Sequence, residues 1–224
     1  MNLVLIGAGW HAREVCAYLD DINAAAADPL VVCGAIDELK APTVSGPLPI
    51  LGGFAALDAW VRGHAPSTVC YLTATGDNAR REQFVRQVDE LKLGTVKAWT
   101  LRHPQTVIGA DAVLGEGTCI APGAVITSHV RIGRHCIVNV KVSISHDCEI
   151  GDWVNLNPGA TVCGNVRLGA GCYIGAGATI IDKVSIGEWS TIGAGAVVID
   201  DIPPFVTAVG VPARVIDSRR RHPA

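Results

Sequence analysis

The chain has little charge and few aromatic side chains: of its 224 residues, 17% are charged, 5% are aromatic and one is a methionine. Its net charge is −3, and apart from a short basic C-terminal tail it has no cluster of Lys and Arg, which argues against a nucleic-acid-binding surface. No apolar run approaches the ~20 residues that span a bilayer. The opening M-N-L-V-L-I-G-A-G lacks the basic region of a secretory signal. We therefore expect a cytoplasmic protein.

Closely spaced cysteine pairs, which often bind zinc, are also missing. Eight cysteines are present, but no two of them show C-x-x-C spacing. An intracellular chain favours free thiols over disulfides. We therefore expect buried free thiols and no bound metal.

What the chain does have is an aliphatic residue at every sixth position through its second half. Starting at Ile108, sixteen successive positions carry Ile, Leu or Val, with no insertion between them. These positions are Ile108, Leu114, Ile120, Ile126, Ile132, Val138, Ile144, Ile150, Leu156, Val162, Leu168, Ile174, Ile180, Ile186, Ile192 and Val198. Glycine follows eight of them. An apolar content of 49% does not produce such a run by chance.

A period of six predicts a short strand and a tight turn, repeated around a prism. Three such faces close one coil, and successive coils stack at the ~4.8 Å spacing of β-strands, burying an aliphatic ladder. The repeats make about five coils, enough for a stable stack. Cys136, Cys148 and Cys172 fall at the small fifth position of their hexads and are expected to fill the core. The pattern resembles the left-handed β-helix of hexapeptide-repeat acyltransferases.

Residues 1–103 show a different pattern, in which apolar strands alternate with amphipathic helices. Strands are expected at 3–6, 30–33 and 68–73, and helices around 15–19 and over 54–61 and 77–91. Such alternation predicts a small parallel α/β sheet.

Between the first strand and the first helix lies a G-x-G-x-x-A loop at residues 7–12. Glycines in such a loop let backbone N–H groups approach a phosphate at the helix N-terminus. The acidic pair Asp37 and Glu38, after the second strand, is suited to hold a ribose or a base. The region is too short for a six-stranded dinucleotide fold, which favours a smaller nucleotide. An NAD site and a simple tight turn remain as alternatives.

Together the two halves resemble one family: the sialic acid O-acetyltransferase-like proteins and the nucleotide-sugar N-acetyltransferases of bacterial glycan synthesis. Three segments carry the resemblance: G-A-G-W-H-A-R-E at 7–14, N-V-K-V-S-I-S-H-D-C-E-I-G at 139–151 and G-V-P-A-R at 210–214. The resemblance implies acetyl-CoA as co-substrate and a homotrimer with active sites between subunits. It implies neither a nucleic-acid partner nor a membrane span.

The resemblance also divides the chain. It implies a Rossmann-like nucleotide-sugar-binding domain at 1–103 and a left-handed β-helix acyltransferase domain at 104–205. A coenzyme-proximal segment and tail follow at 206–224.

The second segment carries the implied catalytic residues. In this family its histidine, here His146, is the general base, and the carboxylate that follows, Asp147, orients it. Neighbours on a straight strand point to opposite faces, so this pair can cooperate only at a coil corner. An imidazole is suited to take the proton that an amine or hydroxyl loses while attacking a thioester.

The other implied site residues divide between the two substrates. On the nucleotide-sugar side are Gly7, Gly9, Trp10, His11, Asp37, Glu38 and Asn139, the last near the acceptor sugar. On the coenzyme side are Asn155, Gly159, Gly164, Gly210, Pro212 and Arg214. Two departures stand out, because some relatives have a second histidine where Asn155 lies and a glycine where Trp10 lies. The G-V-P-A-R segment can equally be a turn that closes the β-helix.

The leading hypothesis is N-acetylation of a nucleotide-linked 4-amino-deoxy sugar, with sugar O-acetylation as the close alternative. A γ-type carbonic anhydrase would need three zinc-binding histidines, and His129, His135 and His146 lack the required spacing. His129 and His135 are instead expected as exposed corner residues, and His103 as a linker residue. A non-enzymatic nucleotide-binding scaffold is the remaining alternative.

Overall fold

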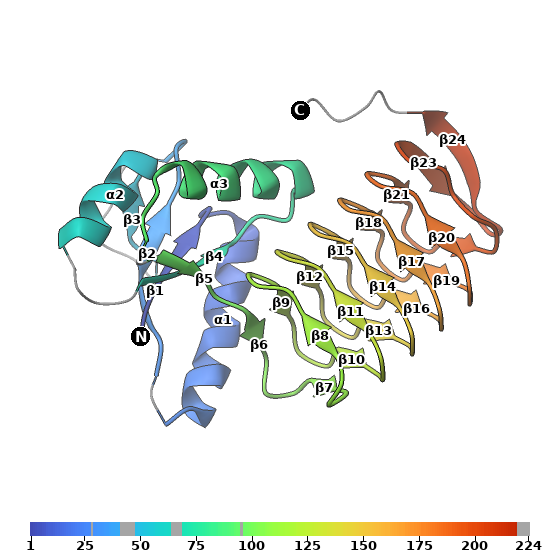
Figure 1. Cartoon of the computed structure of the whole chain (residues 1–224), viewed down its shortest axis with the longest axis horizontal. Coiled ribbons are helices and arrows are strands. Elements are labelled where there is room, and N and C mark those ends of the chain that lie inside the picture. The colour runs from blue at the N-terminus through green and yellow to red at the C-terminus, as the bar shows by residue number, and fades with distance from the viewer. Residues whose placement is uncertain (28, 41–47, 64–68, 95, 219–224) are drawn as a thin grey trace. The chain divides into compact units, whose positions relative to one another are not determined.

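The computed structural model describes residues 1–27, 29–40, 48–63, 69–94 and 96–218 (Figure 1). The chain forms two compact units, Met1–Pro104 and Gln105–Ala224, and each is described by itself. The sequence analysis places this boundary after residue 103 and sets 206–224 apart. In the structure residues 206–218 continue the second unit, and 219–224 lie outside the described residues. None of the described helices is long and apolar enough to cross a membrane.

The first unit is a parallel five-stranded sheet with helices between its strands. The strands are β1 (Asn2–Ile6), β2 (Val31–Ile36), β3 (Ile50–Gly52), β4 (Val69–Thr73) and β5 (Val96–Ala98), in the order β3-β2-β1-β4-β5. The helices are α1 (Trp10–Ala25), α2 (Phe54–Gly63) and α3 (Asn78–Glu90). In β1, residues 3–6 are fully buried, as expected for a central parallel strand covered on both faces.

The predicted α/β alternation is confirmed, but two strands were missed. β3 and β5 are three residues long and occupy the two edges of the sheet. Their sequences are therefore too short to show the apolar pattern that predicts a strand. A further short strand, β6 (Leu101–Arg102), ends this part of the chain. His103 lies at the end of the first unit, as a linker residue would, but its side chain is buried and its Nε2 lies 3.0 Å from the Asp21 carboxylate.

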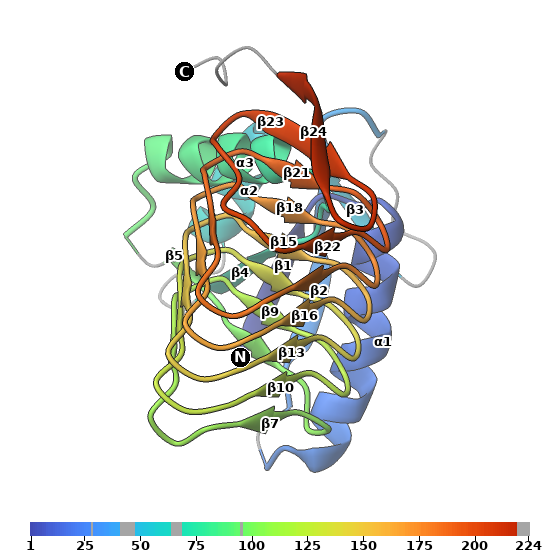
Figure 2. The same cartoon turned by 90° about the vertical axis from the view of Figure 1, so that its right-hand side faces the viewer.

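The second unit is a left-handed parallel β-helix, in which three rows of short parallel strands stack coil on coil (Figures 1 and 2). The first face holds β7 (Val107–Ile108), β10 (Val125–Ile126), β13 (Ser143–Ile144), β16 (Thr161–Val162), β19 (Thr179–Ile180) and β22 (Val197–Val198). The second holds β8 (Val113–Leu114), β11 (Arg131–Ile132), β14 (Glu149–Ile150), β17 (Arg167–Leu168) and β20 (Ser185–Ile186). The third holds β9 (Cys119–Ile120), β12 (Ile137–Val138), β15 (Asn155–Leu156), β18 (Tyr173–Ile174), β21 (Thr191–Ile192), β23 (Val206–Val209) and the antiparallel β24 (Arg214–Ser218).

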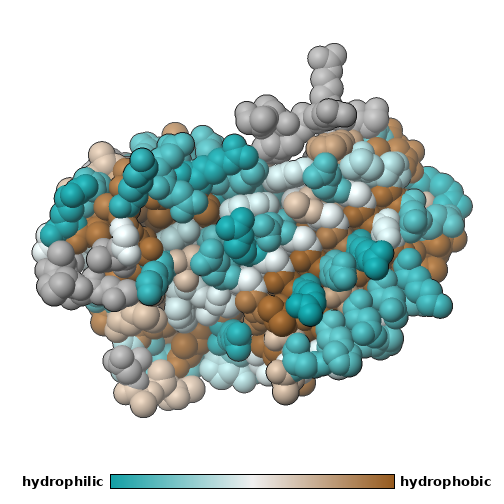
Figure 3. Space-filling view, viewed as in Figure 1, coloured by the Kyte–Doolittle hydropathy of each residue, from teal (hydrophilic) through white to brown (hydrophobic). Residues whose placement is uncertain are grey.

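The aliphatic ladder forms the core of the β-helix, as the six-residue period predicts. Its members from Ile120 to Val198 are at most 4% exposed. Cys136, Cys148 and Cys172 are buried among them, which confirms their role as core residues. Burial raises the pKa of the Cys172 thiol to about 12, so this thiol stays neutral. On the face seen in Figure 3, apolar residues (brown) run in rows along the coils beside hydrophilic ones (teal).

Each coil contains 18 residues, so residues 18 apart share a corner, as the paired strands do on each face. One corner, between the first and second faces, carries Asp111, His129, Asp147, Asn165 and Lys183 in successive coils. The last four adopt positive φ values between 55° and 66°. This conformation is uncommon outside glycine, and Asn, Asp and His are enriched in it.

Another corner corrects one expectation. His135 does lie at a corner, with φ 51°, but it is 1% exposed rather than solvent-facing. Its ring stacks on that of Trp153, one coil later, with 4.9 Å between centroids and 3° between planes. The imidazole is therefore part of the packing of the β-helix.

Candidate active site

His146 and Asp147 lie at a coil corner, directly after strand β13. Asp147 adopts φ 59°, which turns the chain so that neighbouring side chains no longer point to opposite faces. The His146 Nδ1 atom lies 2.8 Å from Asp147 Oδ2. Because the carboxylate accepts from the ring, the proton is assigned to Nδ1 and the lone pair to Nε2. Corner geometry therefore brings the predicted pair together.

Gly164 lies one coil later, directly against the His146 ring. A Cβ atom at Gly164 would lie 2.6 Å from Cε1 and 2.8 Å from Nε2 of His146. The nearest atoms that this Cβ would meet all belong to the imidazole. Glycine at this position thus leaves the space that the ring occupies. Among the described residues, the amide of Gly164 has no acceptor within the chain.

Gly159 is placed differently. Its backbone N–H donates to the Val140 carbonyl at 3.0 Å, so it is not free to bind a substrate oxygen. It lies at the corner between the third and first faces, whereas Gly164 and His146 share the corner between the first and second. Of the three glycines predicted to bind the coenzyme, Gly159, Gly164 and Gly210, it is Gly164 that adjoins His146.

Asn139 and Asn155 do not adjoin His146 within the chain. Asn139 precedes strand β13 and His146 follows it, so the two residues occupy different corners of one coil. The Asn139 Oδ1 atom accepts a hydrogen bond from the Val140 amide at 2.7 Å. Asn155 lies in β15 on the third face and is 3% exposed.

Cys148 follows the pair directly but is not a nucleophile. Burial raises the pKa of its thiol, and the Asp147 charge adds to that effect. Its Sγ–H donates to the Cys163 carbonyl at 3.0 Å. Only the thiolate is an effective nucleophile, so a covalent acyl-cysteine is not favoured here.

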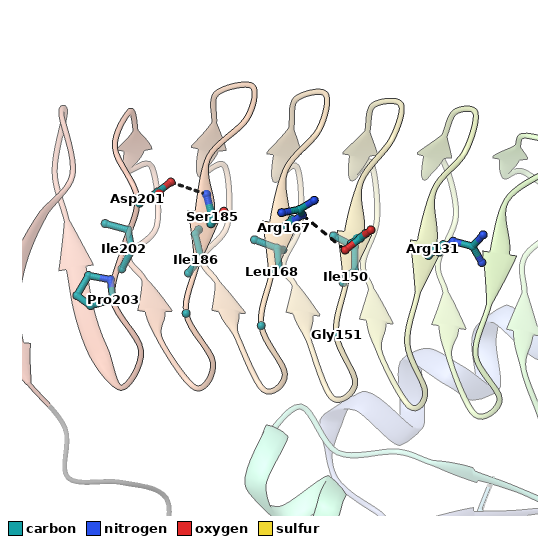
Figure 4. Close-up of a pocket in the computed structure, with 13 residues that line it drawn as sticks. Arg131, Ile150, Gly151, Arg167, Leu168, Ser185, Ile186, Asp201, Ile202 and Pro203 are labelled. Carbon is teal, nitrogen blue, oxygen red and sulfur yellow. Dashed lines mark hydrogen bonds and ion pairs between the residues drawn. The ribbon is translucent and has the colours of Figure 1, made fainter.

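A surface hollow of about 520 Å³ lies beside the corner that carries Asp147. It is lined by Asp111, His129, Arg131, Asp147, Glu149, Asn165 and Arg167. A larger hollow of about 820 Å³ continues along the second face of the β-helix, lined among others by Arg131, Ile150, Leu168, Ser185 and Pro203 (Figure 4). In it Arg167 pairs with Glu149 at 3.6 Å, and the Ser185 amide donates to Asp201 at 2.7 Å (Figure 4). This face thus combines charged groups with an apolar floor.

In the first unit, the glycine loop lies between β1 and α1 and leaves the helix N-terminus open. Gly7 has φ 102°, a conformation that disfavours other residues, and its amide donates to Ile36 O at 2.8 Å. Gly9 is the N-cap of α1, has no side-chain cap, and would place a Cβ in open space. Free N–H groups at a helix N-terminus are suited to phosphate.

Trp10 and His11 begin helix α1. Trp10 is 81% exposed, and the Arg13 guanidinium lies 4.8 Å from its ring centroid. His11 Nδ1 lies 3.0 Å from Glu14, which lowers the pKa of the Glu14 carboxyl. Within the described residues the buried His11 Nε2 has no hydrogen-bond partner. A buried polar atom without a partner is costly, which supports a ligand at this loop.

Asp37 and Glu38 both have partners within the first unit. Asp37 Oδ2 accepts from the Ala8 amide at 3.0 Å and so holds the glycine loop. Glu38 Oε1 accepts from the Phe54 amide at 2.8 Å, at the start of α2. Their positions after β2 agree with the prediction, but hydrogen bonds to the backbone already engage an oxygen of each carboxylate. Sequence reasoning missed these two structural roles.

Gly210 and Pro212 lie in the turn between β23 and β24, and Arg214 begins β24. The turn docks on strand β22, because Val197 N donates to Gly210 O at 3.0 Å and Ala213 N donates to Val197 O at 2.8 Å. Arg214 Nη1 lies 3.5 Å from an Asp200 carboxylate oxygen. The segment therefore closes the β-helix, while its role toward a coenzyme remains a prediction.

Among the described residues, no group of three His, Cys, Asp or Glu side chains is placed to hold a metal ion. What sequence reasoning missed is the environment of His129, which contacts both Asp111 and Asp147. The 18-residue spacing of these three residues is the signal that places them together.

Comparison with known proteins gives matches to both units. Models of the PglD N-terminal domain and of the bacterial transferase hexapeptide repeat match residues 2–88 and 165–200, respectively. GDP-perosamine N-acetyltransferase of Escherichia coli O157:H7 is 32% identical over 150 residues, which is 66% of this chain and 64% of the relative. The chain thus aligns with just under two thirds of that curated relative.

Solved structures match over nearly the whole chain. PerB from Caulobacter crescentus, in complex with CoA and GDP-perosamine, has a TM-score of 0.84 at 29% identity, covering 96% of this chain and 97% of that one. The acetyltransferase domain of PglB from Neisseria gonorrhoeae FA1090, in complex with acetyl coenzyme A, has a TM-score of 0.82 at 28% identity, covering 96% and 98%. Over both units the chain is therefore similar to hexapeptide-repeat transferases with a PglD N-terminal domain, among them nucleotide-sugar N-acetyltransferases.

Proposed function

We propose that the chain is an acetyl-CoA-dependent N-acetyltransferase acting on the amino group of a nucleotide-linked 4-amino-deoxy sugar in bacterial glycan biosynthesis. The observation that carries the proposal is the His146 imidazole, held at Nδ1 by Asp147 and left with Nε2 as a proton acceptor. Similarity to PerB supports the two substrates, because PerB was solved with CoA and GDP-perosamine.

In the proposed reaction, the sugar amine attacks the carbonyl carbon of the acetyl thioester while its proton passes to His146 Nε2. The tetrahedral intermediate then collapses, the carbon–sulfur bond breaks, and the coenzyme thiolate takes up the proton as free thiol. Asp147 stabilises the imidazolium that forms in between. General base catalysis of this kind contributes roughly 10²–10⁴-fold to the rate.

The oxyanion of the intermediate needs N–H donors. The amide of Gly164 is our candidate, since it has no acceptor within the described chain and its residue adjoins His146. We assign Asn155, Gly210, Pro212 and Arg214 to the coenzyme, following the family resemblance. The Gly159 amide already donates to the Val140 carbonyl. Gly159 would therefore contact the coenzyme through its other atoms.

We assign nucleotide binding to the first unit. The open start of α1 after Gly9 and the unpartnered His11 Nε2 support a phosphate or sugar group at this loop. The carboxylate of Asp37 would act chiefly by holding the loop. Exposed Trp10 offers an aromatic face for the nucleotide base.

We also propose a cytoplasmic homotrimer with active sites between subunits. In a single chain, the His146 side chain is 57% exposed, and the hollow lined by the neighbouring Asp147 lies at the surface. A neighbouring subunit would cover this hollow, supply further contacts to the sugar or coenzyme, and exclude water. Sedimentation equilibrium measures the subunit number, and a monomer at assay concentration would contradict this assembly.

The test is incubation of the purified protein with acetyl-CoA and a panel of nucleotide-linked 4-amino sugars, GDP-linked ones included, with product mass as readout. We expect one sugar to gain one acetyl group, and His146→Ala to lower kcat by roughly 10²–10⁴-fold while coenzyme binding by calorimetry persists. Acetylation of free sialic acids alone would favour the O-acetyltransferase alternative. If no sugar is acetylated, the non-enzymatic nucleotide-binding scaffold becomes the remaining hypothesis.

A further inference from the structure

The carboxylate that orients His146 has a second oxygen, which the proposed mechanism does not use. Asp147 Oδ2 lies 2.8 Å from His146 Nδ1, whereas Oδ1 lies 3.6 Å from Nδ1 of a second histidine, His129. A separation of 3.6 Å is too long for a hydrogen bond, so the second contact is ionic in character. Asp147 thus lies between two imidazole rings.

His129 is itself anchored from the preceding coil. Its backbone amide donates to Asp111 Oδ2 at 2.9 Å, and its Nε2 lies 3.2 Å from the same oxygen. Asp111, His129 and Asp147 are 18 residues apart, one coil each, so coil stacking fixes their order along the corner. The imidazole of His129 thus has a carboxylate oxygen near each of its two nitrogens.

Two other charges in the hollow, those of Arg167 and Glu149, pair with each other. Arg167 lies 3.6 Å from the Glu149 carboxylate, on the second face (Figure 4). Arg131 also lines the hollow. Within the described part of the chain, the ionic contacts of Asp147 are with His129 and His146.

We propose that His129 is a positioning residue for the general base: anchored by Asp111, it holds Asp147 in the orientation that keeps the proton of His146 on Nδ1. This inference rests on the proposed function. A single exposed ion pair would stabilise little. Here, however, the backbone amide and the ring of His129 both contact Asp111, and the ring also contacts Asp147. If Asp147 rotated away, the imidazole could carry its proton on Nε2, and the base would lose its acceptor lone pair.

The test compares three variants at coil corners. His129→Gly removes the side chain without straining the backbone at φ 55°. His129→Asn keeps an amide donor near the position of Nδ1 and serves as the conservative replacement. Lys183→Gly is the matched control, because Lys183 occupies the same corner two coils beyond Asp147, with φ 66°. Circular dichroism checks that all three variants fold.

The first readout is the tautomer of His146, followed by ¹⁵N NMR of the imidazole without any substrate. We expect the Nδ1–H form in the unsubstituted protein, a mixture with the Nε2–H form in His129→Gly, and an intermediate result in His129→Asn. Lys183→Gly is expected to match the unsubstituted protein. An unchanged tautomer in a folded His129→Gly variant would overturn the proposal.

The second readout is the acetylation assay. His129→Gly should lower kcat roughly tenfold to a hundredfold, as for a catalytic group displaced by about an ångström, with the KM for acetyl-CoA unchanged. A raised KM with normal kcat would overturn the positioning role. If no amino sugar is acetylated but the tautomer still shifts, the proposed function fails and the role of His129 stands.

Discussion

At the scale of single residues, the site depends on which atoms are absent as much as on which are present. Gly164 contributes no side chain, and the His146 imidazole lies in the space that a Cβ would occupy. Asp147 needs a positive φ to bring its carboxylate beside the preceding side chain. The position of the His146 imidazole therefore depends on Gly164 in the next coil as well as on Asp147 in its own segment.

We predict that Gly164→Ala displaces the His146 ring. A new Cβ 2.6 Å from Cε1 cannot be accommodated without movement, so kcat should fall sharply and the free energy of unfolding should drop by about 1–3 kcal/mol. Urea unfolding and the acetylation assay measure the two effects.

The matched control for this substitution is a double-mutant cycle. In the His146→Ala background the obstructing ring is gone, so the added methyl group of Gly164→Ala should cost little stability. An equal cost in both backgrounds would show that the strain lies elsewhere in the corner.

At the scale of elements, each two-residue strand on the first and second faces of the β-helix pairs an inward ladder residue with a more exposed outward neighbour. In β10 the inward Ile126 is 0% exposed and the outward Val125 is 37% exposed. The three faces have no helix between them, so the inward ladder supplies the apolar burial that holds successive coils together. Stability should therefore differ strongly between adjacent positions of one strand.

We predict that Ile126→Ala lowers the free energy of unfolding by about 2–5 kcal/mol, because it leaves a cavity in a closely packed ladder. Val125→Ala, one residue earlier on the same strand, should cost less than about 1 kcal/mol. Chemical unfolding with urea measures both values. Equal losses would contradict the assignment of the inward face.

At the scale of the whole molecule, the chain contains two units with separate cores. The first is a parallel sheet centred on β1, and the second is a stack of coils around the ladder. In stacked repeats each coil contacts chiefly its neighbours. Each unit therefore has the internal contacts needed to fold on its own.

We predict that residues 105–224, produced alone, form a cooperatively melting β-structure that still binds coenzyme A. Without the glycine loop, the fragment should show a strongly raised KM for the nucleotide sugar, with the KM for acetyl-CoA unchanged. Circular dichroism, calorimetry and the acetylation assay test these points. An unfolded fragment would mean that the β-helix depends on residues 1–104.

Features with a regular spacing could be predicted from the sequence alone. The six-residue period identified the β-helix, its core residues and the buried cysteines, because each coil repeats the same geometry. The strand–glycine–helix order identified the first unit and its loop. The need for a corner at His146 and Asp147 also followed from the alternation of side chains along a strand.

What the tertiary structure alone decided are contacts between residues distant in the chain. His129 is an exposed corner residue, as expected, but coil stacking also places it between Asp111 and Asp147. His135 was expected to be exposed, but the next coil supplies Trp153 to cover it. Glu38 has a partner because the start of α2, 16 residues later, returns to it. Such partners depend on how backbone turns stack in space, which no local pattern of residue types specifies.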